Sequence, residues 1–291
     1  MNLNLNLLAD FFDNALKEDH SIIGDLTSNL IFDRDHKVAF KILAKKDLVL
    51  SGIDIARYYF DKYLSTCSNL KFYFQDKDYV KKDSIILEGI ANVKGILLIE
   101  RVLLNFIQYT SSISTNCFNF IQKLNNPKIS ISDTRKILPY YKTLAKYALY
   151  CGGGMIHRPC LSSMIMIKDN HLAASSEKYD TTNIINKVKN KAPYYSKIEI
   201  ECDNPKQVKL SVLANPDIIM LDNMQHQEII SSINIIRNHN INYKSNILIE
   251  LSGGINIDNI ASYREYDINY ISSSYITNNF NVDISMEMEK I

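Results

Sequence analysis

Six short apolar runs, each ending in polar residues, follow one another from residue 128 to about residue 275. They read KISISDTR, MIMIKDN, KIEIECDN, DIIMLDN, ILIELSGG and INYISSS, and helix-like segments lie between most of them, at 204–215, 224–240 and 256–266. Repeated strand–helix units predict a parallel sheet. Nearly all the strands end in polar residues, which favours an α/β barrel. An open doubly wound sheet binds its ligand at one switch point and would need fewer strands with polar ends.

The first 112 residues show a different pattern. It predicts a helix at 7–19, a turn-like segment at 24–30, two strands within 37–52, a helix at 53–64, a strand at 69–74, a charged loop at 76–83 and a strand at 84–93. A long helix follows at 95–112 and is apolar on most sides. At the other end of the chain, the alternating segment 280–289 predicts a strand that returns to pair with this first domain.

The helix at 95–112 carries one polar stripe. Arg101, Asn105, Gln108 and Ser112 recur every three or four residues and therefore share one face. A stripe on a mostly buried helix needs a partner, because a buried unpaired charge is costly. Two interpretations remain open: Arg101 pairs with its neighbour Glu100, or Arg101 points into an anion site across a subunit contact.

Basic side chains gather between residues 133 and 171. They are Arg135, Lys136, His157, Arg158, Lys168 and His171, with a helix-like run and the glycines 152–154 between them. If strands flank that helix, these charges converge in one pocket, and a pocket of Arg, Lys and His suits anions. The segment CGGG is a weak phosphate signal, and the end of the helix at 140–150 explains it at least as well.

Composition excludes several classes of protein. The formal net charge of the 291-residue chain is +1, so no global field favours nucleic acid. Its five cysteines are odd in number and form no CxxC pair, which predicts a reducing, cytoplasmic environment and speaks against a zinc ribbon. A metal or nucleophile role for Cys151 and Cys160 has no second spaced pair to support it. The amino terminus lacks signal-peptide features, and no apolar run reaches the ~18 residues that indicate a membrane span.

Nine segments together resemble one known family. In order they are GDLTS at 24–28, ERVLLNF at 100–106, DTRK at 133–136, KYALYCGGGMIHR at 146–158, IKDNH at 167–171, IEIE at 198–201, IIMLDN at 218–223, ELSGGI at 250–255 and VDIS at 282–285. Their order and spacing are similar to those of quinolinate phosphoribosyltransferase. The resemblance implies an α/β fold with an N-terminal α/β sandwich domain at 1–112, an incomplete α/β barrel at 113–275 and a tail strand at 276–291 that rejoins the first domain.

The resemblance also implies a reaction. The phosphoribosyl group of phosphoribosyl pyrophosphate is transferred to quinolinate with decarboxylation, which gives nicotinate mononucleotide, pyrophosphate and carbon dioxide for NAD biosynthesis. Magnesium is the expected cofactor, and a homodimer or an assembly of dimers is the expected state, with no nucleic acid or membrane partner. The two carboxylates of quinolinate suit the bidentate forks of arginine.

Site residues are implied by the same resemblance. Around quinolinate it places Arg135, His157, Arg158 and the partner subunit's Arg101. Lys168 helps there or reaches the ribosyl donor, and Lys136 and His171 face the donor's pyrophosphate. Glu201 and Asp222 lie near the metal and the ribose hydroxyls and form the catalytic set with Lys136 and Lys168. The loops that bind the 5′-phosphate hold Ser252, Gly253, Gly254, Ser272, Ser273 and Ser274. Without this context, Glu201 and Asp222 would be solvated charges at strand ends.

Several positions depart from the usual family pattern. They are Ile137 in place of Thr, Tyr140 in place of Gly, Ile156 in place of Asn, Pro159 and Cys160 in place of Leu-Gly, and Ser274 in place of Gly. The charged residues all remain while their polar support is thinner, so a slower enzyme is one expectation. Two other functions stay open: a paralogue that uses another pyridine or ring acid, and a non-catalytic ligand-binding remnant. Simple anion binding has no use for the two retained carboxylates, which favours an enzyme.

Overall fold

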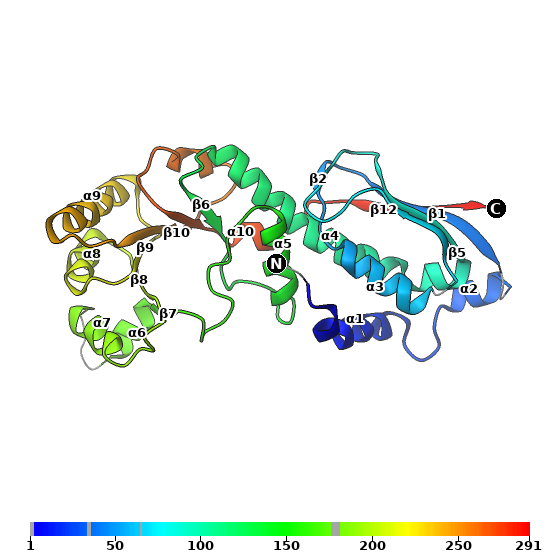
Figure 1. The fold of residues 1–291 in the computed structure, drawn as a ribbon, viewed down its shortest axis with the longest axis horizontal. Coiled ribbons are helices and arrows are strands. Elements are labelled where there is room, and N and C mark those ends of the chain that lie inside the picture. Colours follow the sequence, from blue (N-terminus) through cyan, green and yellow to red (C-terminus); the bar gives the residue numbers. More distant parts are fainter. Residues whose placement is uncertain (1–2, 34–35, 65, 176–180) are drawn as a thin grey trace. The chain divides into compact units, whose positions relative to one another are not determined.

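Two compact units make up the chain (Figure 1). The computed structural model describes residues 3–33, 36–64, 66–175 and 181–291. The first unit consists of Met1–Phe118, Leu138–Gly153 and Thr277–Ile291, and the second of Asn119–Ile137 and Gly154–Ile276. The boundaries expected after residues 112 and 275 lie close to two of these divisions. The segment 138–153, however, was assigned to the barrel, and it clusters with the first unit instead.

An antiparallel four-stranded sheet with helices over one face forms the first unit (Figure 1). Its strand order is β12-β1-β5-β3. Along β1 (Lys37–Ala44) every second residue is buried, the pattern of a sheet with one face on the core. The last strand, β12 (Ile284–Lys290), pairs antiparallel with β1, so the tail returns to this sheet as the alternating sequence predicts. The remaining elements up to residue 151, apart from β6, are α1 (Leu5–His20), α2 (Leu26–Ile31), β2 (Leu48–Val49), α3 (Ile53–Tyr63), β3 (Ser68–Phe72), β4 (Tyr79–Val80), β5 (Ile85–Asn92), α4 (Val93–Leu124) and α5 (Lys142–Cys151).

The polar stripe of α4 binds the returning tail. Gln108 Nε2 donates to the carbonyl oxygen of Ile284 at 3.3 Å, and Ser112 Oγ accepts from the backbone N–H of Val282 at 3.2 Å. The helix has 32 residues and is therefore much longer than the predicted segment 95–112. Arg101 is exposed, and in the described part of the chain no ion pair within 4.0 Å joins it to Glu100, although its charge offsets part of the effect of burial on the pKa of Glu100. The first interpretation of Arg101 is therefore not observed.

Gly152 explains why the segment 138–153 belongs with the first unit. It ends α5 and lies against α4: a Cβ on this residue would be 2.3 Å from the carbonyl oxygen of Ser114 and 2.8 Å from Cβ of Cys117. Only glycine permits so close an approach of two helices. Gly153 follows with a φ of 89°, a conformation that favours glycine. The CGGG segment thus ends a helix and packs it.

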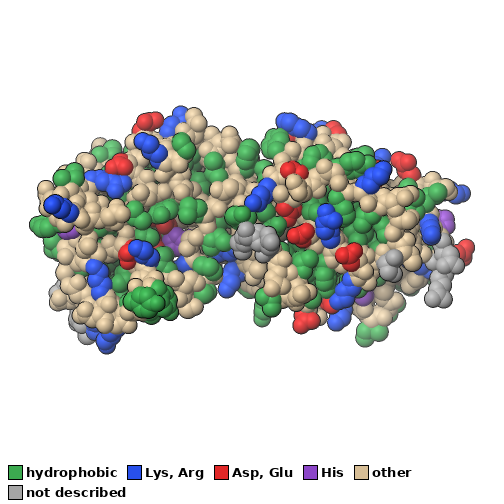
Figure 2. Space-filling model, viewed as in Figure 1, with side chains coloured by type: hydrophobic (Ala, Val, Ile, Leu, Met, Phe, Trp, Pro, Cys, Tyr) green, Lys and Arg blue, Asp and Glu red, His purple; other side chains and the backbone are tan. Residues whose placement is uncertain are grey.

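α4 is also the one helix among the described residues that is long and apolar enough to cross a membrane, and 67% of its apolar window is buried inside the structure. Core helices of globular proteins have the same length and composition. Figure 2 shows basic and acidic side chains interspersed over the visible face of both units, which accords with a net charge of +1.

Six parallel strands, in the order β6-β11-β10-β9-β8-β7, form the sheet of the second unit. β6 and β7 are its edges, and no ladder among the described residues joins them, so the barrel is incomplete, as the resemblance implies. The helices α8 and α9 lie side by side next to β8, β9 and β10 (Figure 1). The elements are β6 (Ser130–Ser132), β7 (Ile165–Ile167), α6 (Asp169–Ala174), α7 (Thr181–Lys189), β8 (Ile198–Cys202), α8 (Pro205–Ser211), η1 (Val212–Ala214), β9 (Ile218–Asp222), α9 (His226–Tyr243), β10 (Leu248–Ser252), η2 (Ile260–Tyr263), β11 (Tyr270–Ser272) and α10 (Tyr275–Asn278).

Three local predictions are wrong. The turn-like segment 24–30 contains α2, because the Asp25 carboxylate caps a helix by accepting from the N–H of Ser28 at 3.0 Å. The charged loop 76–83 contains β4, which pairs with β2. The segment 256–266 forms only the short η2, because the side chains of Asn256 and Asn259 bind nearby backbone N–H groups and favour turns over a helix.

Candidate active site

The carboxyl ends of the parallel strands surround a pocket of about 210 Å³ in the second unit. Side chains at these ends converge because parallel strands finish at the same edge of their sheet. The lining therefore includes residues that are far apart in the sequence. Of the predicted site residues, the pocket is lined by Arg135, Lys136, His157, Arg158, Lys168, Glu201, Asp222, Ser252 and Ser272, together with Asp133, Thr134, Met166 and Met220.

Arg158 is the buried member of the cationic side. The residue is 5% exposed, and its guanidinium Nη1 donates to the carbonyl oxygen of Met164 at 3.2 Å. Burial lowers the pKa of Arg158, and the neighbouring Arg135 guanidinium lowers it further. The two guanidinium groups repel each other in this pocket, and an anionic ligand can relieve that repulsion by neutralising their charge.

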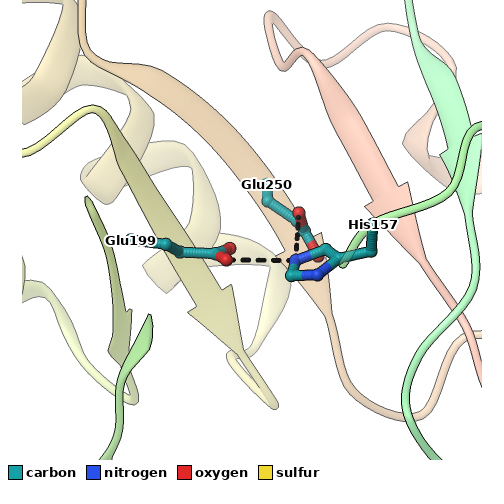
Figure 3. A group of neighbouring side chains, drawn as sticks. All are labelled: His157, Glu199 and Glu250. Atoms are coloured by element: carbon teal, nitrogen blue, oxygen red, sulfur yellow. Dashed lines mark ion pairs between the residues drawn. The ribbon is translucent and has the colours of Figure 1, made fainter. Parts of the chain in front are cut away.

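His157 lies between two buried carboxylates from different strands (Figure 3). Its Nε2 is 3.0 Å from Oε2 of Glu199 on β8 and 3.2 Å from Oε2 of Glu250 on β10. Burial by itself lowers the pKa of His157, but the two carboxylates outweigh burial and raise the pKa to about 10. The imidazole is therefore a cation at neutral pH. Burial also raises the pKa of Glu199.

The loop that carries His157 and Arg158 is held along β6. The backbone N–H of His157 donates to Oδ1 of the fully buried Asp133, at 3.4 Å. Two residues earlier, Met155 forms a parallel bridge with Ser132 at the end of β6. Both contacts place His157 and Arg158 beside the carboxyl end of this strand, where Arg135 and Lys136 also lie.

Two carboxylates form the acidic side of the pocket. Glu201 is on β8 and Asp222 ends β9, and Lys168, which follows β7, makes an ion pair with Glu201. One oxygen each from Glu201, Asp203 and Asp222 lie within 4.8 Å of one another. Carboxylate oxygens at this spacing suit Mg²⁺, so the donor set fits the expected metal. A cation bound there would share Glu201 with Lys168.

Several predicted residues are not in the lining of this pocket: Arg101, which is in the first unit, and His171, Gly253, Gly254, Ser273 and Ser274 in the second. His171 has a local role, because its Nδ1 accepts from the backbone N–H of Lys168 at 2.9 Å and so caps α6. Ser273 is buried, and its hydroxyl donates to the carbonyl oxygen of Ile255 at 2.6 Å.

The loop after β10 needs its glycines for shape. Gly253 has a φ of 91° and Gly254 a φ of 64°. A Cβ on Gly253 would lie 2.4 Å from Oδ1 of Asn223, whereas one on Gly254 would meet nothing within 4 Å. Next to this loop, the buried hydroxyl of Ser272 lines the pocket and has no hydrogen-bond partner among the described residues. A loop of this kind, with a hydroxyl beside it, suits an anion such as phosphate.

Glu199 and Glu250 were missed as site residues. A signal for Glu199 was present, because in IEIE it is two residues from Glu201 and thus on the same face of the strand. The sequence does not, however, reveal which strand of the sheet lies opposite that face. The contact with His157 depends on the strand order in the sheet.

The fold and the pocket define a partial α/β-barrel protein. Its pocket has a positively charged side that suits anions and a side formed by carboxylates. Family models agree with this class and refine it. The model "Quinolinate phosphoribosyl transferase, N-terminal domain" matches residues 25–111, and the model of the C-terminal domain matches residues 113–287. The chain therefore belongs to the quinolinate phosphoribosyl transferase family.

Individual relatives are similar over nearly their whole length. The chain is 34% identical over 268 residues to "Probable nicotinate-nucleotide pyrophosphorylase (carboxylating)" of Methanocaldococcus jannaschii, covering 91% of this chain and 92% of that protein. A protein of the same name from Bacillus subtilis is 32% identical over 266 residues, covering 91% and 88%. The crystal structure of nicotinate-nucleotide pyrophosphorylase from Ehrlichia chaffeensis superposes with a TM-score of 0.89 at 35% identity, covering 99% of this chain and 100% of that one.

Proposed function

We propose that this chain is nicotinate-nucleotide diphosphorylase (carboxylating), a pentosyltransferase of NAD biosynthesis. It transfers the phosphoribosyl group of phosphoribosyl pyrophosphate to quinolinate and releases pyrophosphate and carbon dioxide, leaving nicotinate mononucleotide. One observation supports the proposal most: a single pocket in the barrel domain of this family brings cationic side chains opposite two carboxylates. The cationic side suits a dicarboxylate, and simple anion binding has no use for Glu201 and Asp222.

Quinolinate binds on the cationic side. The guanidinium groups of Arg135 and Arg158 each bind one of its carboxylates with two hydrogen bonds, and His157 adds a third cation beside them. The partner subunit's Arg101 completes this set. The exposure of this residue, and the lack of an ion pair to Glu100 among the described residues, support that role. Lys168 lines the same pocket, makes an ion pair with Glu201 and can serve both substrates.

The ribosyl donor binds on the acidic side and along the glycine loop. Lys136 and His171 face its pyrophosphate. The hydroxyls of the ribose lie near Glu201 and Asp222. These two carboxylates would also hold Mg²⁺, which would supply positive charge that stabilises the leaving pyrophosphate. The loops that bind the 5′-phosphate consist of Ser252, Gly253, Gly254, Ser272, Ser273 and Ser274. Ser273 supports the loop through its bonds to Ile255 and Ser132, and the other residues supply backbone N–H groups and hydroxyls to the phosphate.

The chemistry needs no covalent nucleophile from the protein. The bond from ribose C1 to pyrophosphate breaks with its electron pair on the leaving oxygen, and positive charge develops on the ribose near the two carboxylates. The pyridine nitrogen of quinolinate then attacks C1. The ring is now cationic, so the bond to the carboxylate beside the nitrogen breaks, carbon dioxide leaves and a proton takes its place. The protein contributes orientation and preorganised charge.

Location and assembly are part of the proposal. A homodimer, or an assembly of dimers, provides the second Arg101. The cysteine pattern supports a cytoplasmic protein, and a net charge of +1 without a patch of one sign on the visible face supports neither nucleic acid nor an anionic membrane as a partner.

One assay tests the function. Purified protein is incubated with quinolinate, phosphoribosyl pyrophosphate and Mg²⁺, and nicotinate mononucleotide is measured by chromatography. We expect one mononucleotide for each quinolinate consumed, and no product when a chelator replaces the metal. A folded protein without product refutes the proposal.

The same assay separates the alternatives. Faster turnover of nicotinate than of quinolinate would identify a paralogue for another ring acid. Tight binding of quinolinate by calorimetry without turnover would identify a non-catalytic remnant. The retained pair of arginines favours a dicarboxylate over a monocarboxylate, because each fork binds one carboxylate.

A further inference from the structure

Glu199 and Glu250 are buried acids that the proposed reaction leaves without a role. Glu199 is 0% exposed and Glu250 is 2% exposed, and neither lines the pocket. Both carboxylate oxygens of Glu199 and Oε1 of Glu250 have no hydrogen-bond donor among the described residues. Buried carboxylates in this state are unfavourable unless a cation compensates them. The cation they share is His157.

Both acids act on the same edge of the imidazole. The two dashed lines in Figure 3 meet at one ring nitrogen, Nε2, at 3.0 and 3.2 Å. Nε2 has no aligned hydrogen bond to either acid, so the contact is a charge pair shared by two carboxylates. A neutral imidazole would leave both buried acids without a cation, whereas an imidazolium pairs with them; burial and the charge of Glu250 raise the pKa of Glu199, so the two acids act on His157 together. The ring also lines the pocket, and its side chain is 9% exposed. The donor that remains for a ligand is Nδ1–H.

We propose that Glu199 and Glu250 are positioning residues, which hold His157 as a cation with Nε2 turned into the barrel interior and Nδ1–H available to a carboxylate of a pyridine dicarboxylic acid. This inference rests on the proposed function of the same pocket. Two acids from separate strands fix the plane of the ring as well as its charge. The donor is then in place before the substrate arrives, which is the condition under which a buried charge contributes most to binding.

The charged groups around His157 explain why two acids are needed. Glu199 faces it from β8, Glu250 from β10 and Asp133 from the end of β6, while Arg158 follows it in the chain. The charge of Arg158 interacts with Glu199 and offsets part of its effect. If Glu199 or Glu250 is removed, only one carboxylate remains at Nε2, and His157 loses its proton at a lower pH.

Kinetics of isosteric variants test the inference. In Glu199→Gln and Glu250→Gln we expect KM for quinolinate to rise about tenfold, while KM for phosphoribosyl pyrophosphate changes less than twofold. The ratio kcat/KM for quinolinate should fall between pH 6 and pH 8 in these variants and not in the wild type. Glu250→Asp should restore part of the loss. Glu265→Gln, at an exposed acid of the same unit, is the matched control and should behave as the wild type. A purely structural role would change both KM values and leave the pH profile unmoved.

Nitrogen NMR of the wild type reports the protonation state of His157 directly, so it tests the proposal even if a variant does not fold. With ¹⁵N-labelled histidine, and His157→Gln for assignment, we expect both ring nitrogens of His157 to carry protons at pH 8. A neutral His157 at pH 7 would overturn the proposal. So would one equivalent of transition metal retained after desalting and lost in His157→Gln, since His157, Glu199 and Glu250 are also a possible ligand set. If the wild type makes no mononucleotide, the proposed function fails, and the spectrum still reports the state of His157.

Discussion

Asp13 on α1 accepts three hydrogen bonds from one helix. The hydroxyls of Tyr58 and Tyr63 on α3 donate to Oδ1, each at 2.7 Å, and Lys62 forms an ion pair with Oδ2. Burial alone would raise the pKa of this carboxyl, but the bonds from Lys62, Tyr58 and Tyr63 outweigh burial and lower it to about 2. A lowered folded-state pKa stabilises the protein above the unfolded-state value, and this stabilisation is lost as the pH falls towards 2.

Replacement of this one carboxyl should therefore change stability in a pH-dependent way. At pH 7 we expect Asp13→Asn to lower the free energy of unfolding by about 2 kcal/mol, the value of a shift from 3.8 to about 2. The difference from the wild type should shrink between pH 4 and pH 2. Urea unfolding at several pH values measures it. Asp10→Asn, at an exposed acid on the same helix, is the control, and an equal loss in both variants would contradict the assignment.

At the scale of elements, α4 joins several parts of the first unit. Its hydroxyl-bearing side binds the backbone around β2: Thr115 Oγ1 accepts from the N–H of Val49 at 2.9 Å, and Ser111 Oγ accepts from the N–H of Ser51 at 3.0 Å. The same helix binds the tail through Gln108. Fully buried hydroxyls on a core helix are stable only when such partners exist. α4 therefore holds β2 and the tail, while α5 lies against it at Gly152.

The contact at Gly152 gives a prediction for one element. Gly152→Ala places a Cβ 2.3 Å from the carbonyl oxygen of Ser114, so α5 must move away from α4. We expect a loss of roughly 1–3 kcal/mol in the free energy of unfolding, as for other overpacked sites. Gly24→Asn is the comparison, because nothing lies within 4 Å of its Cβ and Asn tolerates a positive φ. Similar stability of both variants in thermal unfolding would show that α5 is not packed this closely.

The glycine loop after β10 gives a second prediction. Gly253→Ala combines a strained φ of 91° with a Cβ 2.4 Å from Asn223 Oδ1. Gly254→Ala is strained by its φ of 64° alone, because nothing lies within 4 Å of its Cβ. Gly253→Ala should therefore weaken binding of phosphoribosyl pyrophosphate by tenfold or more, roughly the effect of one misplaced charged hydrogen bond, and Gly254→Ala should weaken it less. Calorimetric titration measures both. Equal affinities in the two variants would remove this loop from the donor site.

For the whole molecule, the question is whether a site needs two chains. Arg101→Ala and Lys136→Ala should each be inactive. When they are mixed, dissociated and reassembled, hybrid dimers gain one intact site, and we expect about a quarter of wild-type activity from random pairing. A mixture of Lys136→Ala with His157→Ala is the control, because both residues serve the same chain's site and no hybrid is intact. Full wild-type activity in a monomer, measured by sedimentation, would contradict a shared site.

The sequence by itself determined the local elements and most of the pocket. Short apolar runs predicted the six strands of the second unit, and the polar residues that end them predicted chemistry at the carboxyl edge of the sheet. Arg135 and Lys168 were indicated by the cluster of basic residues, whereas Glu201 and Asp222 were indicated only by the resemblance to the family. All four line the pocket because each is at or just beyond a strand end, and all parallel strands end at one edge. Local signals of this kind are also seen at the start of α8, where the Asn204 side chain accepts from N–H groups two and three residues away.

Only the tertiary structure decided which distant groups touch. His157 meets Glu199 and Glu250 because β8 and β10 flank β9 in the sheet, and a one-residue shift in the register would turn either acid to the other face. Gly152 is required by its close contact with α4 and not by its own neighbours in the sequence, so the local pattern gave no sign of this packing. Local patterns record the preferences of adjacent residues, whereas these contacts depend on strand order and helix packing, which involve the whole chain.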